Sequence, residues 1–148
     1  MRKYKLINNV LGWIVFLIAS TVYLMTIEPT ASFWDCGEFI SSAFKLEVGH
    51  PPGAPFFMLT ANLFTQLASD ASSVAKMVNS MSALFSGLTI LFLFWSITHL
   101  ARKIMVDDES EISLGQMITI MGSGLVGALA YTFSDTFWFS AVEGEVYA

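Results

Sequence analysis

Uncharged, mostly apolar residues fill three long runs of the chain, at 10–27, 77–101 and 112–134. The runs hold 18, 25 and 23 residues, and about 20 apolar residues cross the hydrocarbon core of a bilayer as an α-helix. The pattern therefore predicts three membrane-spanning helices. Basic residues precede the first run as in a signal peptide, but no small-residue cleavage site follows it, so the run is interpreted as an uncleaved anchor.

A fourth uncharged stretch, at 48–69, begins with the letters V-G-H-P-P-G-A-P, which cannot propagate a helix. The segment after it, 56–68, has 13 residues, the length of an interfacial or re-entrant helix. Cytoplasmic loops carry an excess of Lys and Arg, and this rule favours three spans over four. With three spans, Lys45 and Lys76 lie outside, and five basic residues lie inside: Arg2, Lys3, Lys5, Arg102 and Lys103.

Helical spacing also occurs in the outer loop, which covers residues 28–76. Apolar side chains at 33, 36, 39, 40, 43 and 44 form one face of a helix over 33–48, and polar ones at 35, 38, 42 and 45 form the other. Ser32 fits the N-cap of this helix, with Asp35 at its third position. The predicted fold class is all-α integral membrane, with three transmembrane helices plus interfacial amphipathic helices in the first outer loop.

Small residues repeat in the third run at a spacing of four. Ser123 pairs with Gly127, and Gly124 pairs with Ala128. Such pairs let two helix backbones approach closely in a membrane, so this run is expected to pack tightly against another helix.

Composition agrees with the membrane class. Hydrophobic residues make up 55% of the 148 residues and charged residues 13%, where a soluble domain carries about 25% charged residues. The net charge of −5 argues against a nucleic-acid partner, because phosphate backbones are bound by basic patches. The single cysteine, Cys36, cannot form an intrachain disulfide.

Acidic residues gather on the predicted outer side, which receives eight of the twelve acids. Asp35 and Glu38 stand one helical turn apart, and acids near a membrane boundary are costly and often functional. The alternative is structural, since the helix dipole favours an acid in the first turn. His50 lies in the stiff proline-rich loop nearby. Glu143 and Glu145 follow the third span, where they either face the first two acids or form a solvated loop.

Three segments together resemble a known family: SFWDCGEFISSAFKL (32–46), VGHPPGAP (48–55) and FWFSAVEGEVYA (137–148). Over about residues 5–148, the chain is similar to the N-terminal part of a bacterial membrane-protein family that is common in Bacteroidetes. That family is similar to the eukaryotic transmembrane O-mannosyltransferases, within the multi-span glycosyltransferases of the GT-C fold. The specific signal is the pair W-D-C-G-E-F and H-P-P-G-A-P, about a dozen residues apart.

The resemblance implies an enzyme that moves a sugar from a polyprenyl-phosphate carrier to a hydroxyl of a protein or glycan acceptor. It assigns Asp35 as the general base, and Glu38 as the residue that positions the acceptor or tunes Asp35. His50 is implied to order the loop or contact the substrate, and Glu143 and Glu145 are implied to bind substrate or line the cavity. The resemblance names no metal ligand and leaves the cofactor open, with a divalent cation as a candidate.

Two other functions compete with the enzyme: a transporter or flippase-like subunit, and a non-catalytic membrane assembly subunit. Transporters place their acids at mid-depth in the spans, whereas Asp35 and Glu38 belong to the outer boundary. The expected partners are membrane lipid, the donor and the acceptor, without nucleic acid.

Members of the GT-C fold have more spans than three. Residues 1–148 are therefore interpreted as the N-terminal part of a longer enzyme, inactive alone. Its expected location is the bacterial inner membrane, with the N-terminus in the cytoplasm and the site facing the periplasm.

Overall fold

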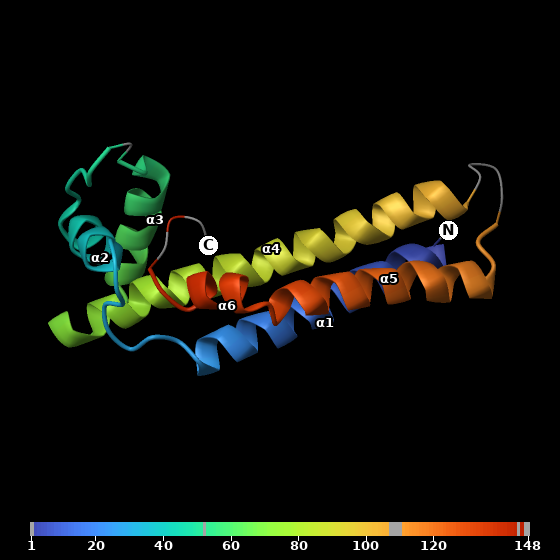
Figure 1. The fold of residues 1–148 in the computed structure, drawn as a ribbon, viewed down its shortest axis with the longest axis horizontal. Helices are drawn as coiled ribbons and strands as arrows, with labels where there is room; N and C mark the ends of the chain where they lie inside the picture. The colour runs from blue at the N-terminus through green and yellow to red at the C-terminus, as the bar shows by residue number, and fades with distance from the viewer. Residues whose placement is uncertain (1, 52, 107–110, 145, 147–148) are drawn as a thin grey trace. The chain divides into compact units, whose positions relative to one another are not determined.

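Helices make up the structure, a computed structural model that describes residues 2–51, 53–106, 111–144 and 146. In chain order (Figure 1) they are α1 (Arg2–Met25), α2 (Cys36–Lys45), α3 (Pro55–Thr65), the 3₁₀-helix η1 (Ala71–Ser73), α4 (Val74–Met105), α5 (Leu114–Thr132) and α6 (Asp135–Ala141). No β-strand occurs in the described ranges, which confirms the all-α fold class.

Three helices are long and apolar enough to cross a membrane, which confirms the prediction of three spans. They cover Arg2–Met25, Ala71–Met105 and Leu114–Thr132, with 24, 35 and 19 residues. The first two extend beyond the uncharged runs into flanking Lys and Arg residues. These residues are good helix formers whose long side chains reach the membrane interface, so a charge ends the apolar run without ending the helix. The protein is an integral membrane protein.

The chain divides into two compact units, and α1 and α4 each contribute to both. Unit 1 combines Met1–Ala19 with Gly87–Ser134, and unit 2 combines Ser20–Ser86 with Asp135–Ala148. Buried apolar residues from three helices form the interior of unit 1: Val15 and Ala19 of α1, Ile90, Leu91 and Phe94 of α4, and Ile120, Met121 and Ala128 of α5.

The small residues of α5 pack closely against α4, as predicted, but only one of the two predicted pairs is buried. Gly124 and Ala128 are buried, and a Cβ atom on Gly124 would lie 2.6 Å from Thr98 Cγ2. Of the other pair, Gly127 also approaches α4, since a Cβ atom there would lie 2.6 Å from Ile97 Cδ1, but Ser123 is exposed, so the prediction was wrong for Ser123 alone. The reason is angular, since neighbouring residues of a helix point about 100° apart, and Gly124 rather than Ser123 faces α4.

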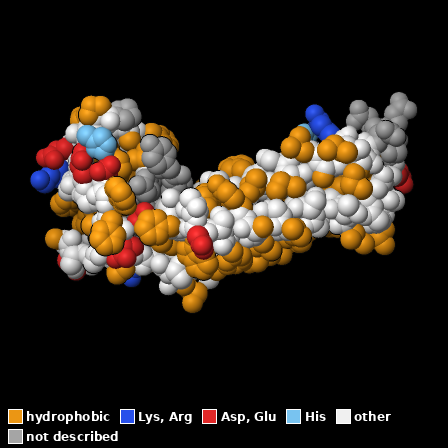
Figure 2. All heavy atoms as spheres, viewed as in Figure 1, with side chains coloured by type: hydrophobic (Ala, Val, Ile, Leu, Met, Phe, Trp, Pro, Cys, Tyr) orange, Lys and Arg blue, Asp and Glu red, His pale blue; other side chains and the backbone are white. Residues whose placement is uncertain are grey.

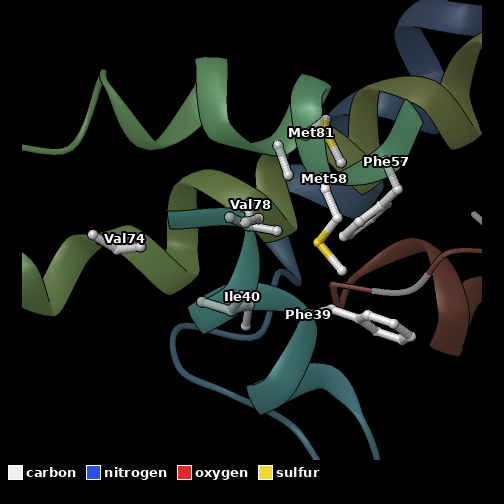
Figure 3. Packing of buried hydrophobic residues seen from close by; sticks show 9 residues of the cluster. Phe39, Ile40, Phe57, Met58, Val74, Val78 and Met81 are labelled. Atoms are coloured by element: carbon white, nitrogen blue, oxygen red, sulfur yellow. The ribbon is translucent and has the colours of Figure 1, made fainter. Parts of the chain in front are cut away.

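Unit 2 is built around a core to which α2, α3 and the first turns of α4 each contribute three residues. The nine residues are Phe39, Ile40, Ala43, Phe57, Met58, Ala61, Val74, Val78 and Met81 (Figure 3). Spacings of three and four place the members of each helix on one face. This shared burial holds α2 and α3 in place, because helices shorter than about 12 residues are marginal by themselves.

α2 confirms an amphipathic helix before His50 but is shorter than predicted, Cys36–Lys45 instead of 33–48. Trp34 has a φ of 62° and Leu46 a φ of 54°. These left-handed conformations cannot continue a right-handed helix, so they bound α2 at both ends. The predicted faces were wrong at three positions, since Phe33 and Phe44 are exposed and Ser42 is buried.

Each of these three departures has a local cause. Phe33 precedes the shortened helix and leaves its apolar face. The chain turns back at Leu46, and the Glu47 N–H donates to the Ser42 carbonyl oxygen at 2.8 Å, which brings the returning chain to Ser42. The exposed ring of Phe44 lies on an outer part of α2, beyond the stripe formed by Phe39, Ile40 and Ala43.

α3 confirms a short helix after the proline-rich loop. Its 11 residues extend roughly 16 Å, about half of the hydrocarbon thickness, so it cannot span a bilayer. Asn62 of α3 holds the end of α2: its Nδ2 donates to the carbonyl oxygens of Ala43 at 2.9 Å and Phe44 at 3.2 Å. The last carbonyls of a helix lack the N–H donor of a following turn. The Leu46 N–H reaches the Ala43 oxygen only at 3.3 Å, and Asn62 adds a donor to both carbonyls, which fixes the two helices to each other.

Candidate functional site

Asp35, Glu38 and His50 lie together in unit 2, so the structure assembles three of the five predicted site residues into one acid–histidine cluster. Glu38 is in the first turn of α2, Asp35 directly precedes that helix, and His50 comes from the loop between α2 and α3. The side chain of Asp35 is 60% exposed, that of Glu38 is 43% exposed and that of His50 is 45% exposed. Figure 2 shows histidine beside acidic side chains, with apolar side chains around them.

Asp35 occupies the N-cap of α2, yet its side chain makes no capping hydrogen bond. The prediction that Ser32 is the N-cap was wrong, because Trp34, in a left-handed conformation, separates Ser32 from the helix. A capping aspartate would bond a backbone N–H of the first turn. The Asp35 carboxylate is directed at His50 instead, with Oδ2 3.9 Å from Nε2. Helix capping therefore does not account for Asp35.

The residue before Asp35 carries backbone strain. Trp34 is 89% exposed and has a φ of 62°, although only glycine adopts this region freely. For other residues the left-handed region costs roughly 1–2 kcal/mol. Strain of this kind gathers at functional sites, where the surrounding structure enforces it.

Glu38 is engaged on both oxygens by His50. The His50 backbone N–H donates to Oε1 at 2.7 Å, and the ring Nδ1 lies 3.1 Å from Oε2. The backbone hydrogen bond first, and then the ring contact, lower the pKa of Glu38 below its usual range. Because the pKa of Glu38 is lower in the folded state than in the unfolded state, its contact with His50 stabilises the fold at any pH above the unfolded-state pKa. This stabilisation is lost as the pH falls through the lowered, folded-state pKa. Glu38 is ionised at neutral pH.

The loop around His50 is held by a turn and by an aromatic ring. The Gly53 N–H donates to the His50 carbonyl oxygen at 2.8 Å, and Gly53 has a φ of 85°, which glycine adopts without strain. The ring centroid of Phe39 lies 5.7 Å from that of His50. Because Glu38 engages Nδ1, the other ring nitrogen, Nε2, is the one that faces Asp35.

The cluster has the spacing of a metal site, since one ligand atom from each of its residues lies within 4.8 Å of the others. Carboxylates and an imidazole suit a divalent transition metal ion. The donor set fits such an ion. A histidine that binds a metal through one ring nitrogen commonly donates the other ring N–H to a carboxylate, and Glu38 would be that carboxylate for His50. Asp35 and His50 would hold the ion, which would supply a positive charge at the cluster.

The remaining two predicted site residues follow α6. Glu143 lies in the turn after this helix and is 4% exposed, which excludes a solvated loop for its side chain. A Cβ atom on the adjacent Gly144 would lie 3.2 Å from Ile40 Cγ1, so this turn packs on the buried side of α2. Glu145 lies outside the described residues, and its contact with substrate stays a prediction.

Asn79 of α4 supports the approach to the cluster, and the sequence reasoning missed it. Its fully buried Nδ2 donates to the carbonyl oxygens of Glu28 at 2.7 Å and Thr30 at 3.0 Å. These bonds fix the segment that leads from α1 to Asp35. The available signal was an amide inside an apolar span, because polar side chains in such helices commonly hydrogen-bond to a neighbouring element.

An apolar cavity of about 330 Å³ adjoins the loop that carries His50. Its lining includes Leu46, Val48, Pro55, Met58 and Leu59. Val48 is 88% exposed and Leu59 is 62% exposed, so the cavity lies within an exposed apolar surface of the kind that lipid or a ligand can cover. The acid–histidine cluster therefore has an apolar surface within the same loop.

Comparison with known proteins places this site in a family. The family model described as "Protein O-mannosyl-transferase TMEM260 N-terminal domain" matches residues 35–148, a region that starts at Asp35 and contains the whole acid–histidine cluster. The chain belongs to this family. Membership confirms the predicted similarity to transmembrane O-mannosyltransferases.

Two relatives carry the same description. The chain is 27% identical over 136 residues to "Protein O-mannosyl-transferase tmem260" of Dictyostelium discoideum, covering 91% of the chain and 14% of that protein. It is 28% identical over 134 residues to "Protein O-mannosyl-transferase TMEM260" of Mus musculus, covering 90% of the chain and 16% of that protein. The chain thus spans less than a fifth of the length of these relatives. No solved structure gives a significant match.

Proposed function

We propose that the chain is the N-terminal part of a membrane glycosyltransferase. The enzyme moves a sugar from a polyprenyl-phosphate carrier to a hydroxyl of a protein or glycan acceptor, and the names of its relatives indicate that the sugar is mannose. The family and both relatives are named as protein O-mannosyl-transferases. The observation that carries the proposal is the state of Asp35, a carboxylate at an N-cap without a capping bond, beside a histidine that Glu38 holds.

In this proposal Asp35 is the general base. It takes the proton of the acceptor hydroxyl as the oxygen bonds to the anomeric carbon, while the bond from that carbon to the phosphate oxygen breaks. The electron pair of the broken bond leaves with the polyprenyl phosphate, and attack from the opposite face inverts the anomeric centre. Glu38 and His50 are positioning residues, because Glu38 holds the imidazole and the imidazole faces Asp35 at 3.9 Å.

The apolar surface beside the cluster suits a lipid-linked donor. The 330 Å³ cavity is lined by other residues of the loop that carries His50, and Phe33 and Trp34 expose 80% and 89% of their surface just before Asp35. The leaving phosphate needs positive or hydrogen-bonding partners. Lys45, the nearest lysine in sequence, faces Glu47 at 3.9 Å. We therefore assign the phosphate-binding groups to a part of the longer protein outside residues 1–148 and expect the isolated chain to be inactive.

The proposed orientation puts the N-terminus in the cytoplasm and the cluster on the opposite side, the periplasm if the source is bacterial. Support comes from the basic residues at the two ends of the spans. In a Cys36→Ala background, an impermeant thiol reagent added outside intact cells should label Ser69→Cys and not Glu111→Cys. Both positions are exposed in the structure, so accessibility alone does not separate them. The reverse labelling pattern would refute the orientation.

Sugar transfer by the full-length protein tests the function. The purified protein, reconstituted in lipid, should transfer mannose from polyprenyl-phosphate mannose to a serine- and threonine-containing acceptor and release the polyprenyl phosphate. A matched reaction with a nucleotide-linked mannose should give no product. Ion or lipid transport without any sugar transfer would favour the transporter or flippase instead and contradict the proposal.

A further inference from the structure

Unit 1 contains a cavity that the proposed reaction does not use. It has a volume of about 380 Å³ and lies between the first turns of α1 and the last turns of α4. Tyr4 and Asn8 of α1 line it, together with Phe92, Trp95, His99 and Arg102 of α4. All of these residues belong to unit 1, so the cavity is independent of the acid–histidine cluster in unit 2.

The polarity of this cavity changes along α4. Phe92, which is 59% exposed, and Trp95 form its apolar part, and His99 and Arg102 form its basic part. Residue 102 lies ten helical steps after residue 92, roughly 15 Å farther along the helix. A membrane phospholipid changes in the same direction, from an apolar acyl chain through the glycerol to a charged phosphate. The cavity therefore matches a lipid along its length, and not only at a charged headgroup.

The walls of the cavity are fixed by contacts between α1 and α4. The Arg102 guanidinium carbon lies 5.2 Å from the centre of the Tyr4 ring, a cation–π arrangement. The Trp95 indole N–H donates to the Asn8 carbonyl oxygen at 3.4 Å. A Cβ atom on Gly12 would lie 2.5 Å from that indole nitrogen, so only glycine lets the ring lie against α1. The aromatic and basic parts are thus held in place by the protein itself.

We propose that this cavity binds one anionic phospholipid, with the phosphate at Arg102 and His99 and the upper acyl chain against Phe92 and Trp95. A guanidinium offers paired N–H donors that match phosphate oxygens. Basic cavities between membrane helices are the expected receptors of anionic headgroups. Under the proposed orientation, this lipid belongs to the cytoplasmic leaflet, opposite the side of sugar transfer.

Native mass spectrometry of the purified full-length protein tests the proposal, with phosphatidylglycerol or phosphatidylcholine added in detergent. The protein should retain one phosphatidylglycerol and no phosphatidylcholine. Arg102→Gln should lower the retained phosphatidylglycerol roughly tenfold. Ser96→Leu, which fills the cavity without changing charge, should lower it as well. Lys103→Gln is the matched control, because it removes the same charge from the next residue, which does not line the cavity.

Several results would overturn the proposal. Equal losses in Arg102→Gln and Lys103→Gln would show diffuse attraction to negative charge, and equal retention of both lipids would show an apolar groove without headgroup recognition. Unchanged retention in Ser96→Leu would place the lipid elsewhere, even if Arg102→Gln failed to fold. Displacement of phosphatidylglycerol by an equal concentration of polyprenyl phosphate would assign the cavity to the sugar carrier, and displacement by inorganic phosphate would assign it to free anions.

Discussion

Asp35→Asn should lower the sugar-transfer turnover of the full-length protein by a factor of about 10² to 10⁴. The amide keeps the size of the carboxylate but cannot take the proton of the acceptor hydroxyl. Because Asp35 makes no capping hydrogen bond, the substitution should leave α2 folded. Steady-state kinetics should show a lower kcat with little change in the affinity for the donor, since an interaction made only in the transition state is lost.

Two other variants show whether a loss of turnover in Asp35→Asn is specific to Asp35. Asp70→Asn changes another exposed aspartate, which caps η1 through the Ser73 N–H at 2.9 Å, and asparagine caps almost as well, so turnover should stay within about twofold. Glu38→Gln should cause an intermediate loss, because an amide keeps an acceptor for the His50 N–H but loses the charge beside the ring. If Asp35→Asn keeps turnover within a few-fold of the parent, Asp35 is not the base.

Gly124→Leu should destabilise unit 1 by roughly 1–3 kcal/mol through overpacking. A Cβ atom at this position would lie 2.6 Å from Thr98 Cγ2 and 2.9 Å from Phe94 Cε2, both on α4. Phe94 is fully buried and Thr98 is 1% exposed, so neither side chain has free space to move into. The helices must therefore separate, and denaturant titration of the purified protein in micelles should show a lower free energy of unfolding.

Gly122→Leu is the matched control for this change. It lies in the same helix, two residues earlier, and a Cβ atom there would meet no atom within 4 Å. Both variants gain the same helix propensity, so the difference between them isolates the contact with α4. Equal stabilities of the two variants would show that α4 and α5 do not pack closely at Gly124.

Much of the fold follows from apolar periodicity. Long uncharged runs predict α1, α4 and α5 because a spanning helix must satisfy its own backbone in lipid. Helix ends are harder to predict, since Lys and Arg continue α1 and α4 beyond the runs. The start of α2 was missed for a different reason. Trp34 has a left-handed backbone, which tryptophan itself does not favour, so the residue type gives no sign of it.

The three residues of the acid–histidine cluster were named from the sequence, but their geometry was not predicted. Motif resemblance singled out Asp35, Glu38 and His50, but no periodic pattern relates residue 38 to residue 50 across a proline-rich loop. The supporting contacts were not predicted either, since an amide in an apolar span indicates a hydrogen bond without identifying its partner. Asn62 and Asn79 each donate two hydrogen bonds to backbone carbonyls of distant segments, and backbone acceptors leave no mark on residue type.

The attachment of Glu38 to His50 uses two chemically different donors, a backbone N–H and a ring nitrogen. Every residue except proline has a backbone N–H, so any non-proline residue at position 50 can keep the hydrogen bond to Glu38 Oε1. Placement of the loop and chemistry of the imidazole are therefore separable properties. A substitution at position 50 removes the imidazole and one of the two contacts, whereas a substitution at Glu38 can remove both contacts, so the two positions should show unequal tolerance when function is selected.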